Sequence, residues 1–298
     1  MVFPFEDYED YRLGGFHAVH LGDKFDNDRY IVEHKLGYGT TSTVWLAHDL
    51  QEQRYVALKI YLADMPTDVD GEVPDVTFLR HLHRYRREQT RRGTPPLWSH
   101  FPMVLDKFMV HGPNGGHVCL VMEVLGGRLC DMLEITPDFR LPHQIGMSIA
   151  LQITDAVKEM HASGVVHGDL HQANIVFDVL NIAEWRSTED VYSHLGKPFV
   201  EDVPEELHGP GFPKYCVLCV GERRWWELCI RWLMVPTIKI IDFSEASFVK
   251  PGEAIDKELH TAINTAAPEA VFGDLVTPAV DVWAVGCIIF GSMADHPL

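Results

Sequence analysis

The chain has 298 residues, of which 46% are hydrophobic, so it can bury a sizeable core in one or two domains. Its formal net charge of −18 disfavours direct nucleic-acid binding and favours a basic protein as partner, unless the acidic surface serves solubility alone. No apolar run reaches the roughly 18–20 residues of a membrane span, and the acidic start lacks the features of a signal peptide.

The cysteine content indicates the cellular compartment of the protein. Six cysteines are scattered over the chain, which fits reduced thiols in an intracellular compartment better than a disulfide framework. We therefore expect an intracellular protein of the cytoplasm or the nucleus. The composition gives no oligomeric state.

The first part of the chain has the pattern of a sheet. After a leader over residues 1–28, β-branched and aromatic residues alternate with polar ones, and glycines separate the runs. The alternation predicts antiparallel strands at 29–36, 42–49 and 55–61, with the glycine-rich stretch L-G-Y-G-T-T-S-T-V between the first two. A helix is expected over about 74–88.

Two more strands are expected near 103–110 and 118–123, joined by the turn H-G-P-N-G-G. The character then becomes helical. The sequence thus predicts an α+β protein with a small antiparallel β lobe over 29–125 and a helical lobe over 126–298.

The helical part contains one clear amphipathic helix, whose apolar residues recur every three or four positions and belong to the core. They are Ile145, Ile149, Ile153, Val157 and Met160. Residues 179–237 form an expected insertion, followed by a strand at 237–242. A last helix is predicted over about 278–291.

The segment Val166–Ile175 carries the strongest chemical signal. Its sequence V-H-G-D-L-H-Q-A-N-I places Asp169 and Asn174 five residues apart. Phosphoryl transfer to a hydroxyl needs a carboxylate to accept the hydroxyl proton and oxygen ligands to hold a metal on the phosphates. Small-molecule phosphotransferases use the same H-G-D-L-H-x-x-N pattern, so this segment alone leaves the substrate class open.

Four other motifs accompany this segment, and all five stand in the order found in protein kinases. They are the glycine-rich stretch with Gly37 and Gly39, V-A-L-K ending at Lys59, I-K-I-I-D-F-S with Asp242, A-P-E at 267–269, and D-V-W-A-V-G at 281–286.

The chain resembles the eukaryotic protein kinases, and within them the SR-protein kinases of fungal type. The stretches similar to that family are G-G-F-H-A-V-H-L-G-D, G-Y-G-T-T-S-T-V-W-L-A-H-D, G-P-N-G-G-H-V-C-L-V-M-E-V-L-G, L-G-K-P and F-S-E-A-S. The resemblance covers nearly the whole chain except about 216–236. It implies a bilobal protein-kinase fold.

The resemblance also implies an activity. It predicts ATP- and magnesium-dependent phosphorylation of serine or threonine in basic, arginine-serine-rich proteins, including splicing factors. An acidic chain is consistent with basic substrates, and we expect neither a nucleic acid nor a membrane as direct partner.

Roles for individual residues follow from the matching motifs. Asp169 is the expected catalytic base, and Asn174 and Asp242 are the expected magnesium ligands. Glycine allows backbone N–H groups to approach phosphate, and a lysine in an apolar strand is explained by pairing with phosphate oxygens. The expected nucleotide-binding residues are Leu36, Gly37, Gly39, Val44, Ala57, Lys59, the gatekeeper Met122, and the backbone of Glu123 and Leu125.

The helix carboxylate that pairs with Lys59 in kinases is a departure from the family pattern. Asp75 takes the position of the usual glutamate, and its side chain is one methylene shorter. Glu72 is the nearby alternative, so the sequence leaves the partner of Lys59 open.

Three more departures surround the chemistry. His171 stands where a phosphate-contacting lysine is usual, which predicts pH dependence near about 6–7 unless it is an exposed loop residue without a role. Gly168 replaces an arginine that gathers a phosphorylated activation loop, so loop phosphorylation is not expected to switch the protein on. Ser244 replaces the usual glycine after Asp-Phe and restricts the backbone there.

The region 216–236 has no counterpart in the family pattern, and the chain stops soon after the expected helix that contains Asp281, where the helical lobe of the family continues. Cys216 and Cys219 form a lone C-x-x-C, which favours free thiols over a zinc site. The apolar segment around them is either a docking helix with Trp225, Trp226 and Trp232 or non-native sequence. We also expect a truncated helical lobe that lacks its last helices and exposes apolar surface.

Three functions therefore stay in competition. The leading one is an SR-protein-kinase-like serine/threonine kinase in which Asp169, Lys59 and His171 are catalytic. A kinase-like pseudoenzyme that binds nucleotide with little transfer is the second, and a small-molecule phosphotransferase is the third.

Overall fold

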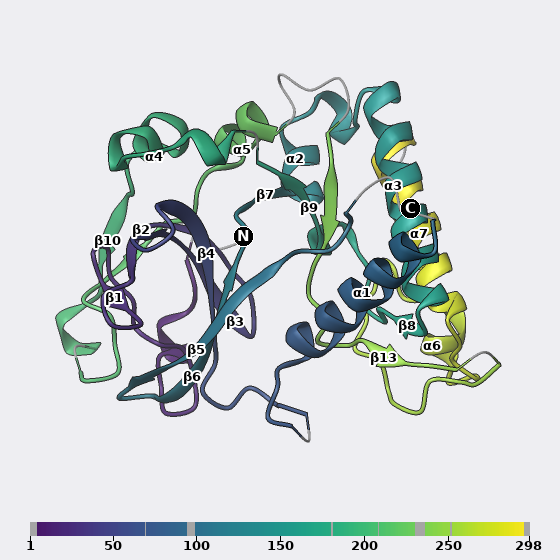
Figure 1. Ribbon diagram of the computed structural model, residues 1–298, viewed down its shortest axis with the longest axis horizontal. Coiled ribbons are helices and arrows are strands. Elements are labelled where there is room, and N and C mark those ends of the chain that lie inside the picture. Colours follow the sequence, from purple (N-terminus) through teal and green to yellow (C-terminus); the bar gives the residue numbers. More distant parts are fainter. Residues whose placement is uncertain are drawn as a thin grey trace. The chain divides into compact units, whose positions relative to one another are not determined.

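The computed structural model describes residues 5–68, 70–93, 99–179, 181–207, 209–229, 236–250 and 252–294, and Figure 1 shows its elements. The chain forms two compact units. Unit one comprises Met1–Val73, Met103–Leu125 and Val179–Leu228, and unit two comprises Pro74–Pro102, Gly126–Asp178 and Cys229–Leu298. The sequence predicted one boundary between the lobes, at residue 125. The two units do not follow it, because the helix after residue 73 belongs to unit two and most of the insertion belongs to unit one.

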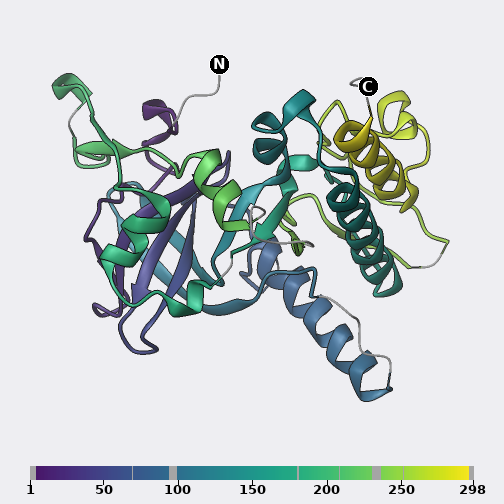
Figure 2. The same ribbon diagram turned by 90° about the horizontal axis from the view of Figure 1, so that it is seen from above.

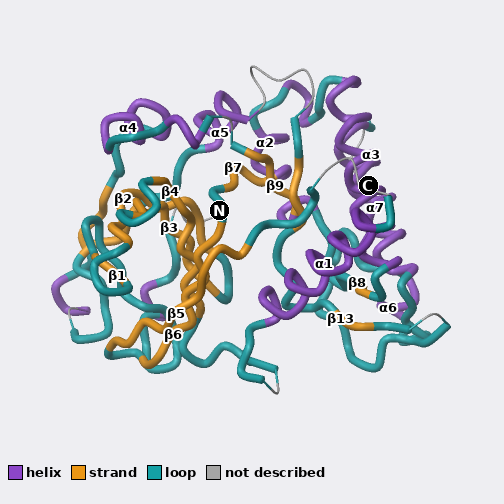
Figure 3. The backbone as a smooth tube through the Cα atoms, in the orientation of Figure 1, coloured by secondary structure: helices purple, strands orange, loops and turns teal. Residues whose placement is uncertain are grey.

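Unit one is built on a six-stranded antiparallel sheet in the order β1-β2-β3-β4-β6-β5 (Figure 3). Its strands are β1 (Lys24–Phe25), β2 (Tyr30–Tyr38), β3 (Ser42–Asp49), β4 (Arg54–Tyr61), β5 (Val104–Gly112) and β6 (Gly115–Met122). The alternation of apolar and polar residues had predicted all of these strands except the short β1.

The core of unit one lies on one face of this sheet. Because successive strand residues point to opposite faces, every second residue of β3 and β4 reaches the core. Trp45, Leu58 and Val121 are each at most 1% exposed and belong to one apolar cluster. Val217 from the insertion is fully buried in the same cluster.

The insertion is folded rather than a polar spacer. It contains α4 (Thr188–Leu195), the paired strands β10 (Val200–Asp202) and β11 (Tyr215–Val217), and α5 (Glu222–Cys229). Trp225 on α5 is only 4% exposed, so its side chain does not form a docking surface. Trp232 lies outside the described residues.

The leader is also an integral part of unit one. Glu6 is 2% exposed and forms an ion pair with Lys35 of β2. The Lys35 side chain is fully buried, and the Tyr11 hydroxyl donates a hydrogen bond to the Glu6 carboxylate. Asn114, in the β5–β6 turn, donates to the carbonyl oxygens of Phe16 and Gly211, both at 2.8 Å. The leader, the sheet and the insertion therefore fold together.

Unit two is mainly helical. Its helices are α1 (Pro74–Arg91), α2 (Leu129–Glu134), α3 (His143–Ala162), α6 (Pro268–Phe272) and α7 (Ala279–Met293). Two small sheets accompany them: β12 (Ile238–Ile240), β9 (Ile175–Asp178) and β7 (Leu125–Arg128) form one, and β13 (Ser247–Phe248) and β8 (Val165–Val166) form the other. Short 3-10 helices in unit two cover Pro137–Phe139 and Gln172–Asn174, and those in unit one cover Tyr8–Asp10, Ile182–Glu184 and Glu205–Leu207.

Helices α3 and α7 lie side by side in both Figure 1 and Figure 2. Ile149, Ile153 and Met160 of α3 are at most 2% exposed, as the spacing of apolar residues predicted. On α7, Trp283 and Phe290 are 48% and 44% exposed, so part of this helix presents apolar side chains to solvent. No helix in the described ranges has the length and apolar character to cross a membrane.

Candidate active site

The segment between β8 and β9 is anchored in unit two by one buried carboxylate. The backbone N–H groups of His167 and Gly168 donate to the two oxygens of Asp281, at 2.9 and 3.0 Å. His161 at the end of α3 also contacts this carboxylate, at 2.9 Å. Asp281 is 1% exposed and is the first residue of the D-V-W-A-V-G motif on α7.

Gly168 is required by the shape of this segment. Its φ is +79°, in the left-handed region that glycine adopts at little cost. A Cβ atom there would lie 2.7 Å from the carbonyl oxygen of Glu245. An arginine at this position is thus incompatible with the observed backbone, which gives a structural reason for that departure from the kinase pattern.

Asp169 is half-buried and carries two hydrogen-bonding neighbours. Its Oδ1 accepts from the Ala262 N–H at 2.9 Å, and its Oδ2 lies 3.5 Å from His171 Nε2. Burial by itself raises the pKa of Asp169, but the hydrogen bonds from His171 and Ala262 outweigh it and lower the pKa below its ordinary value. Asp169 is therefore held as a carboxylate, the form that can accept a proton.

His171 is tied into the same group rather than being an exposed loop residue. Its Nδ1 accepts from the Ala173 N–H at 3.2 Å, which places the proton of the neutral imidazole on Nε2. His171 Nε2 in turn faces Asp169. The Asn174 amide nitrogen lies 3.1 Å from His171 Nε2. The imidazole is thus oriented to support the carboxylate.

Asn174 is 6% exposed, and its amide group has a defined orientation. The Nδ2 group donates to the Asp169 carbonyl oxygen at 2.9 Å. This contact uses the amide nitrogen, so the amide oxygen is the atom available as a metal ligand.

Pairing of β9 with β12 brings the second expected ligand next to Asn174. Ile240 is the partner of Ile175, and the Ile241 N–H donates to the Asn174 carbonyl at 3.0 Å. Asp242 follows directly, with a left-handed φ of +65° and a side chain that accepts from Ser244 N–H at 3.3 Å. One carboxylate and one amide oxygen suit Mg²⁺, which usually takes one or two protein carboxylates together with substrate phosphates.

Phe243 fixes the backbone after Asp242. Its ring is fully buried, with Phe78 and Phe101 6.3 Å away and His167 5.2 Å away. Its N–H donates to Asp75 Oδ1 at 2.9 Å. Asp75, which the sequence analysis considered as a partner of Lys59, thus holds the metal-ligand loop from α1.

Glu72, the alternative to Asp75, lies in unit one and forms an ion pair with Lys107 of β5. Lys59 stands opposite Val44 in β3 and opposite Leu120 in β6. Its Nζ lies 4.9 Å from the centre of the Tyr61 ring.

The remaining nucleotide-binding candidates all lie in unit one. Gly37 is opposite Val44 across the β2–β3 hairpin, and a side chain at Gly37 or Gly39 would meet open space. Ala57 is the cross-strand partner of Met122, and both are buried. The register therefore keeps these residues on neighbouring strands of one sheet.

The two backbone candidates after β6 differ in what they can offer. The Glu123 N–H already donates to the Met103 carbonyl, at 3.3 Å, and the Glu123 side chain accepts from the Met103 N–H at 2.9 Å. The carbonyl oxygen of Glu123 is thus the group it can present to an adenine ring. Leu125 begins β7, and Leu36 lies in β2 next to Gly37.

Comparison with known proteins identifies the family. Residues 30–185, more than half of the chain, match the protein kinase domain. This chain belongs to the protein kinase family. It is 34% identical to protein kinase dsk1 of Schizosaccharomyces pombe over 204 residues, which cover 67% of this chain and 34% of dsk1.

Other kinases give the same result. SRSF protein kinase 3 of Homo sapiens is 34% identical over 58% of this chain and 30% of its own length. A serine/threonine protein kinase of Aspergillus fumigatus is 28% identical over 96% of this chain and 62% of its own length. The chain therefore spans about a third of the length of dsk1 and of SRSF protein kinase 3. Their names support the resemblance to SR-protein kinases.

Solved structures confirm the fold. The crystal structure of the kinase domain of PF14_0431 matches with a TM-score of 0.57 and 17% identity, over 94% of this chain and 68% of that one. The kinase fold, with an antiparallel sheet in one lobe and helices in the other, was the α+β architecture predicted from the sequence.

Two contacts around Asp169 and Gly168 could not be predicted from the sequence. The Ala262 N–H donates to the Asp169 carboxylate. The Thr261 hydroxyl donates to the Gly168 carbonyl oxygen at 2.6 Å. Residues 261 and 262 precede A-P-E in the chain, but nothing in their types signals this contact. Asp281 had a signal, the D-V-W motif, since a lone acid within an apolar helix indicates a buried polar partner.

Proposed function

We propose that this chain is an ATP- and magnesium-dependent serine/threonine protein kinase that acts on arginine-serine-rich proteins inside the cell. The observation that carries this proposal is the state of Asp169. The carboxylate is ionised and held between the Ala262 N–H and His171, and Asn174 beside it has its amide oxygen available. A base and a metal ligand in one hydrogen-bonded segment are what hydroxyl-directed phosphoryl transfer needs.

The chemistry follows from those positions. The hydroxyl oxygen of the substrate forms a new bond to the γ-phosphorus of ATP, the bond from that phosphorus to the bridging oxygen of ADP breaks, and the hydroxyl proton passes to Asp169. His171 donates toward Asp169 Oδ2 and keeps the carboxylate turned in one direction. Most of the rate acceleration would come from positioning and charge stabilisation.

Magnesium would be held by the Asn174 amide oxygen and the Asp242 carboxylate. When bound, the ion neutralises charge that develops on the phosphate oxygens. Asp75 contributes indirectly, because its hydrogen bond to the Phe243 N–H fixes the backbone adjacent to Asp242. In unit one, Gly37, Gly39 and Lys59 would bind the phosphates, and Met122 and Glu123 the adenine ring.

The substrate class is supported by charge and by similarity. The chain carries 43 acidic and 25 basic residues, which favours a cationic substrate over an anionic one. Relatives such as SRSF protein kinase 3 are named for SRSF proteins, which motivates an arginine-serine-rich substrate for this chain.

The test is transfer of labelled phosphate from ATP, with magnesium, to an arginine-serine repeat peptide. We expect incorporation by the unaltered chain and loss of at least about 100-fold in rate for Asp169→Asn, since a positioned base contributes roughly 10²–10⁴-fold. Glu184→Gln, which removes one acidic charge elsewhere, should leave the rate unchanged. Equal rates for Asp169→Asn and the unaltered chain would exclude the assigned base.

A kinase-like nucleotide-binding protein is the second candidate. The presence of His171 at the usual lysine position and of Ser244 after Phe243 favours it. Binding of a fluorescent ATP analogue that is abolished by Lys59→Ala, without transfer to peptide, would select this candidate. Transfer to a small molecule such as an aminoglycoside, but not to peptide, would instead support the phosphotransferase.

A further inference from the structure

Helix α1 carries a line of arginines along its exposed side. Residues 80–92 contain six arginines and no lysine, in a chain whose net charge is −18. Four of them recur at spacings of four, three and four residues, which places them on one face of a helix. This arginine face consists of Arg80, Arg84, Arg87 and Arg91, and all four side chains are exposed.

Three of the four arginines of the arginine face do not take part in ion pairs or side-chain hydrogen bonds within the part of the chain that the structure describes. Within the residues that the structure describes, Arg84, Arg87 and Arg91 make no ion pair and no side-chain hydrogen bond. Arg86, on another side of α1, does pair with Glu159 of α3, at 3.4 Å. The helix thus separates an arginine used for packing within unit two from arginines directed to solvent.

A hollow surface begins beside Arg84. One pocket of about 300 Å³ is lined by His81, Arg84, Tyr85 and Glu88 of α1, with Ala162 and Ser163 at the end of α3. His81 Nε2 contacts the Ser163 carbonyl oxygen at 2.9 Å, so α1 is fastened to this turn.

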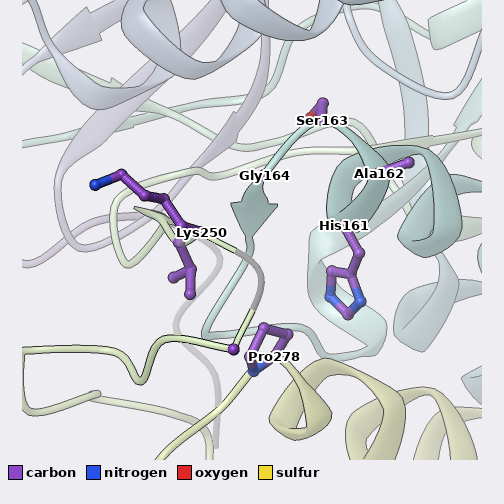
Figure 4. A pocket seen from close by; sticks show the side chains of 8 residues that line it. His161, Ala162, Ser163, Gly164, Lys250 and Pro278 are labelled. Atoms are coloured by element: carbon purple, nitrogen blue, oxygen red, sulfur yellow. The ribbon is translucent and has the colours of Figure 1, made fainter.

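A second pocket of about 450 Å³ continues from the same turn, and Figure 4 shows His161 and Lys250 on opposite sides of it. The two pockets share Ala162 and Ser163. Lys250 is 83% exposed, and its Nζ lies 3.8 Å from a carboxylate oxygen of Glu253. The pockets thus connect Arg84 of the arginine face with Lys250 across the end of α3, and Glu88 is the acidic residue between them.

We propose that the arginine face of α1, together with these two pockets, is a docking surface for an acidic segment of a partner protein, rich in Asp and Glu. This surface is separate from the residues assigned to phosphoryl transfer. Arginine is suited to the role because its planar guanidinium binds carboxylates through two parallel hydrogen bonds and is weakly hydrated compared with lysine.

The linear arrangement points to a run of charges rather than to one anion. Arg80 and Arg91 are eleven residues apart, about 16 Å along a helix axis. An extended peptide covers that length with about five residues. A single phosphate group would need converging donors, whereas these side chains are spread along α1.

Charge also favours a short peptide over a nucleic acid. The strongly negative protein repels a long polyanion over its whole surface, but a short acidic segment experiences mainly the local field of α1. Screening by salt should then weaken the binding, because the arginines are exposed.

The experiment measures fluorescence anisotropy of a dye-labelled decapeptide of Glu and Asp, titrated with the full chain at low and at physiological ionic strength. We expect saturable binding that weakens with salt. The variant Arg84→Glu with Arg87→Glu should lose at least about tenfold in affinity, since like charges would face the peptide. Arg54→Glu with Arg223→Glu, which changes the net charge equally at exposed sites of unit one, should change affinity less than about twofold.

Circular dichroism and thermal unfolding of both double variants should match those of the unaltered chain, which would exclude misfolding as the cause of lost binding. The proposal is overturned by equal affinities of the two double variants, by absence of binding at low ionic strength, or by tighter binding of a single-stranded oligonucleotide of equal charge. Because the assay contains no ATP, its result is independent of whether the chain transfers phosphate.

Discussion

At the scale of single residues, the environment of Asp169 decides its chemistry. The carboxylate loses solvation through burial but gains the Ala262 N–H and His171 as partners, and the balance lowers its pKa. A base with this environment stays ionised at every pH near neutrality. An acid limb of the kinase reaction near pH 6–7 would therefore originate from another group.

The lowered pKa predicts how stability changes with pH. Because the folded-state pKa lies below the unfolded one, this group stabilises the protein above about pH 4, and the contribution is lost as pH falls through the folded pKa. The difference in free energy of unfolding between the unaltered chain and Asp169→Asn should thus be constant from about pH 5 to 8 and shrink below about pH 4. Denaturant unfolding across this range measures it, and a difference that grows on acidification would contradict the assignment.

Asp75 provides a second residue-scale prediction. Asp75→Ala would leave the buried Phe243 N–H without its acceptor, at a cost of about 1–3 kcal/mol, and would free the backbone beside Asp242. Asp75→Asn keeps an acceptor oxygen and should restore most of the stability. Urea unfolding and the magnesium dependence of the rate measure both effects. If the alanine and asparagine variants are equally stable, the hydrogen bond is not what Asp75 supplies.

At the scale of elements, the segment between β8 and β9 depends on backbone that only glycine tolerates. Gly168 combines a φ of +79° with a carbonyl oxygen 2.7 Å from the site of a Cβ atom. Gly273, at the end of α6, has a similar φ of +76° but open space around it. Alanine at Gly273 would bear only the free-energy cost of the left-handed backbone, whereas alanine at Gly168 would also bear the cost of the steric clash.

We therefore expect Gly168→Ala to destabilise unit two more than Gly273→Ala. The left-handed conformation costs each variant roughly 1–2 kcal/mol, and the contact with Glu245 adds to that for Gly168 alone. Only Gly168→Ala should also lower the rate of phosphate transfer, because the displaced backbone carries Asp169. Chemical denaturation and the peptide assay give the two quantities, and equal losses for both variants would show that the clash is relieved.

The same scale shows where local pattern suffices. Strands β2 to β6 and helix α3 were predicted within a few residues, because their apolar residues repeat with the period of the element. Helix α7 was predicted equally closely, although its residues are apolar on nearly all sides. Helix α1 extends to Arg91, three residues beyond the expected end at 88, since the terminal turn has no apolar residue to mark it. The short strands β10 and β11 were missed, because their pairing is decided by contacts with the leader and the sheet.

At the scale of the molecule, unit one depends on residues that are remote in sequence. Glu6 of the leader and Lys35 of β2 are both buried, and the Lys35 carbonyl accepts from the Val220 N–H of the insertion at 3.2 Å. The leader and the insertion are thus connected to the strand that enters the glycine-rich hairpin.

Removing one charge of this pair should be costly. Lys35→Met leaves Glu6 as a buried carboxylate without a cation, and Glu6→Leu leaves Lys35 as a buried cation without an anion. Each variant should therefore lose about 3–5 kcal/mol of the free energy of unfolding. The double variant should recover a large part of that loss, because no unpaired charge is left. Thermal unfolding of the three variants forms a double-mutant cycle. Additive losses would mean that the two side chains do not interact.

The sequence by itself determined the family, the order of the motifs and the types of the main elements, since these depend on residue identity and on local periodicity. It also supplied Asp169, Asn174 and Asp242 as candidates. Only the tertiary structure decided that Asp75 binds the Phe243 N–H, that Ala262 and Asp281 support the segment around Asp169, and that the insertion folds into unit one. Those contacts join residues far apart in the chain, so no local pattern records them, and they form because buried polar groups must find partners when the chain folds.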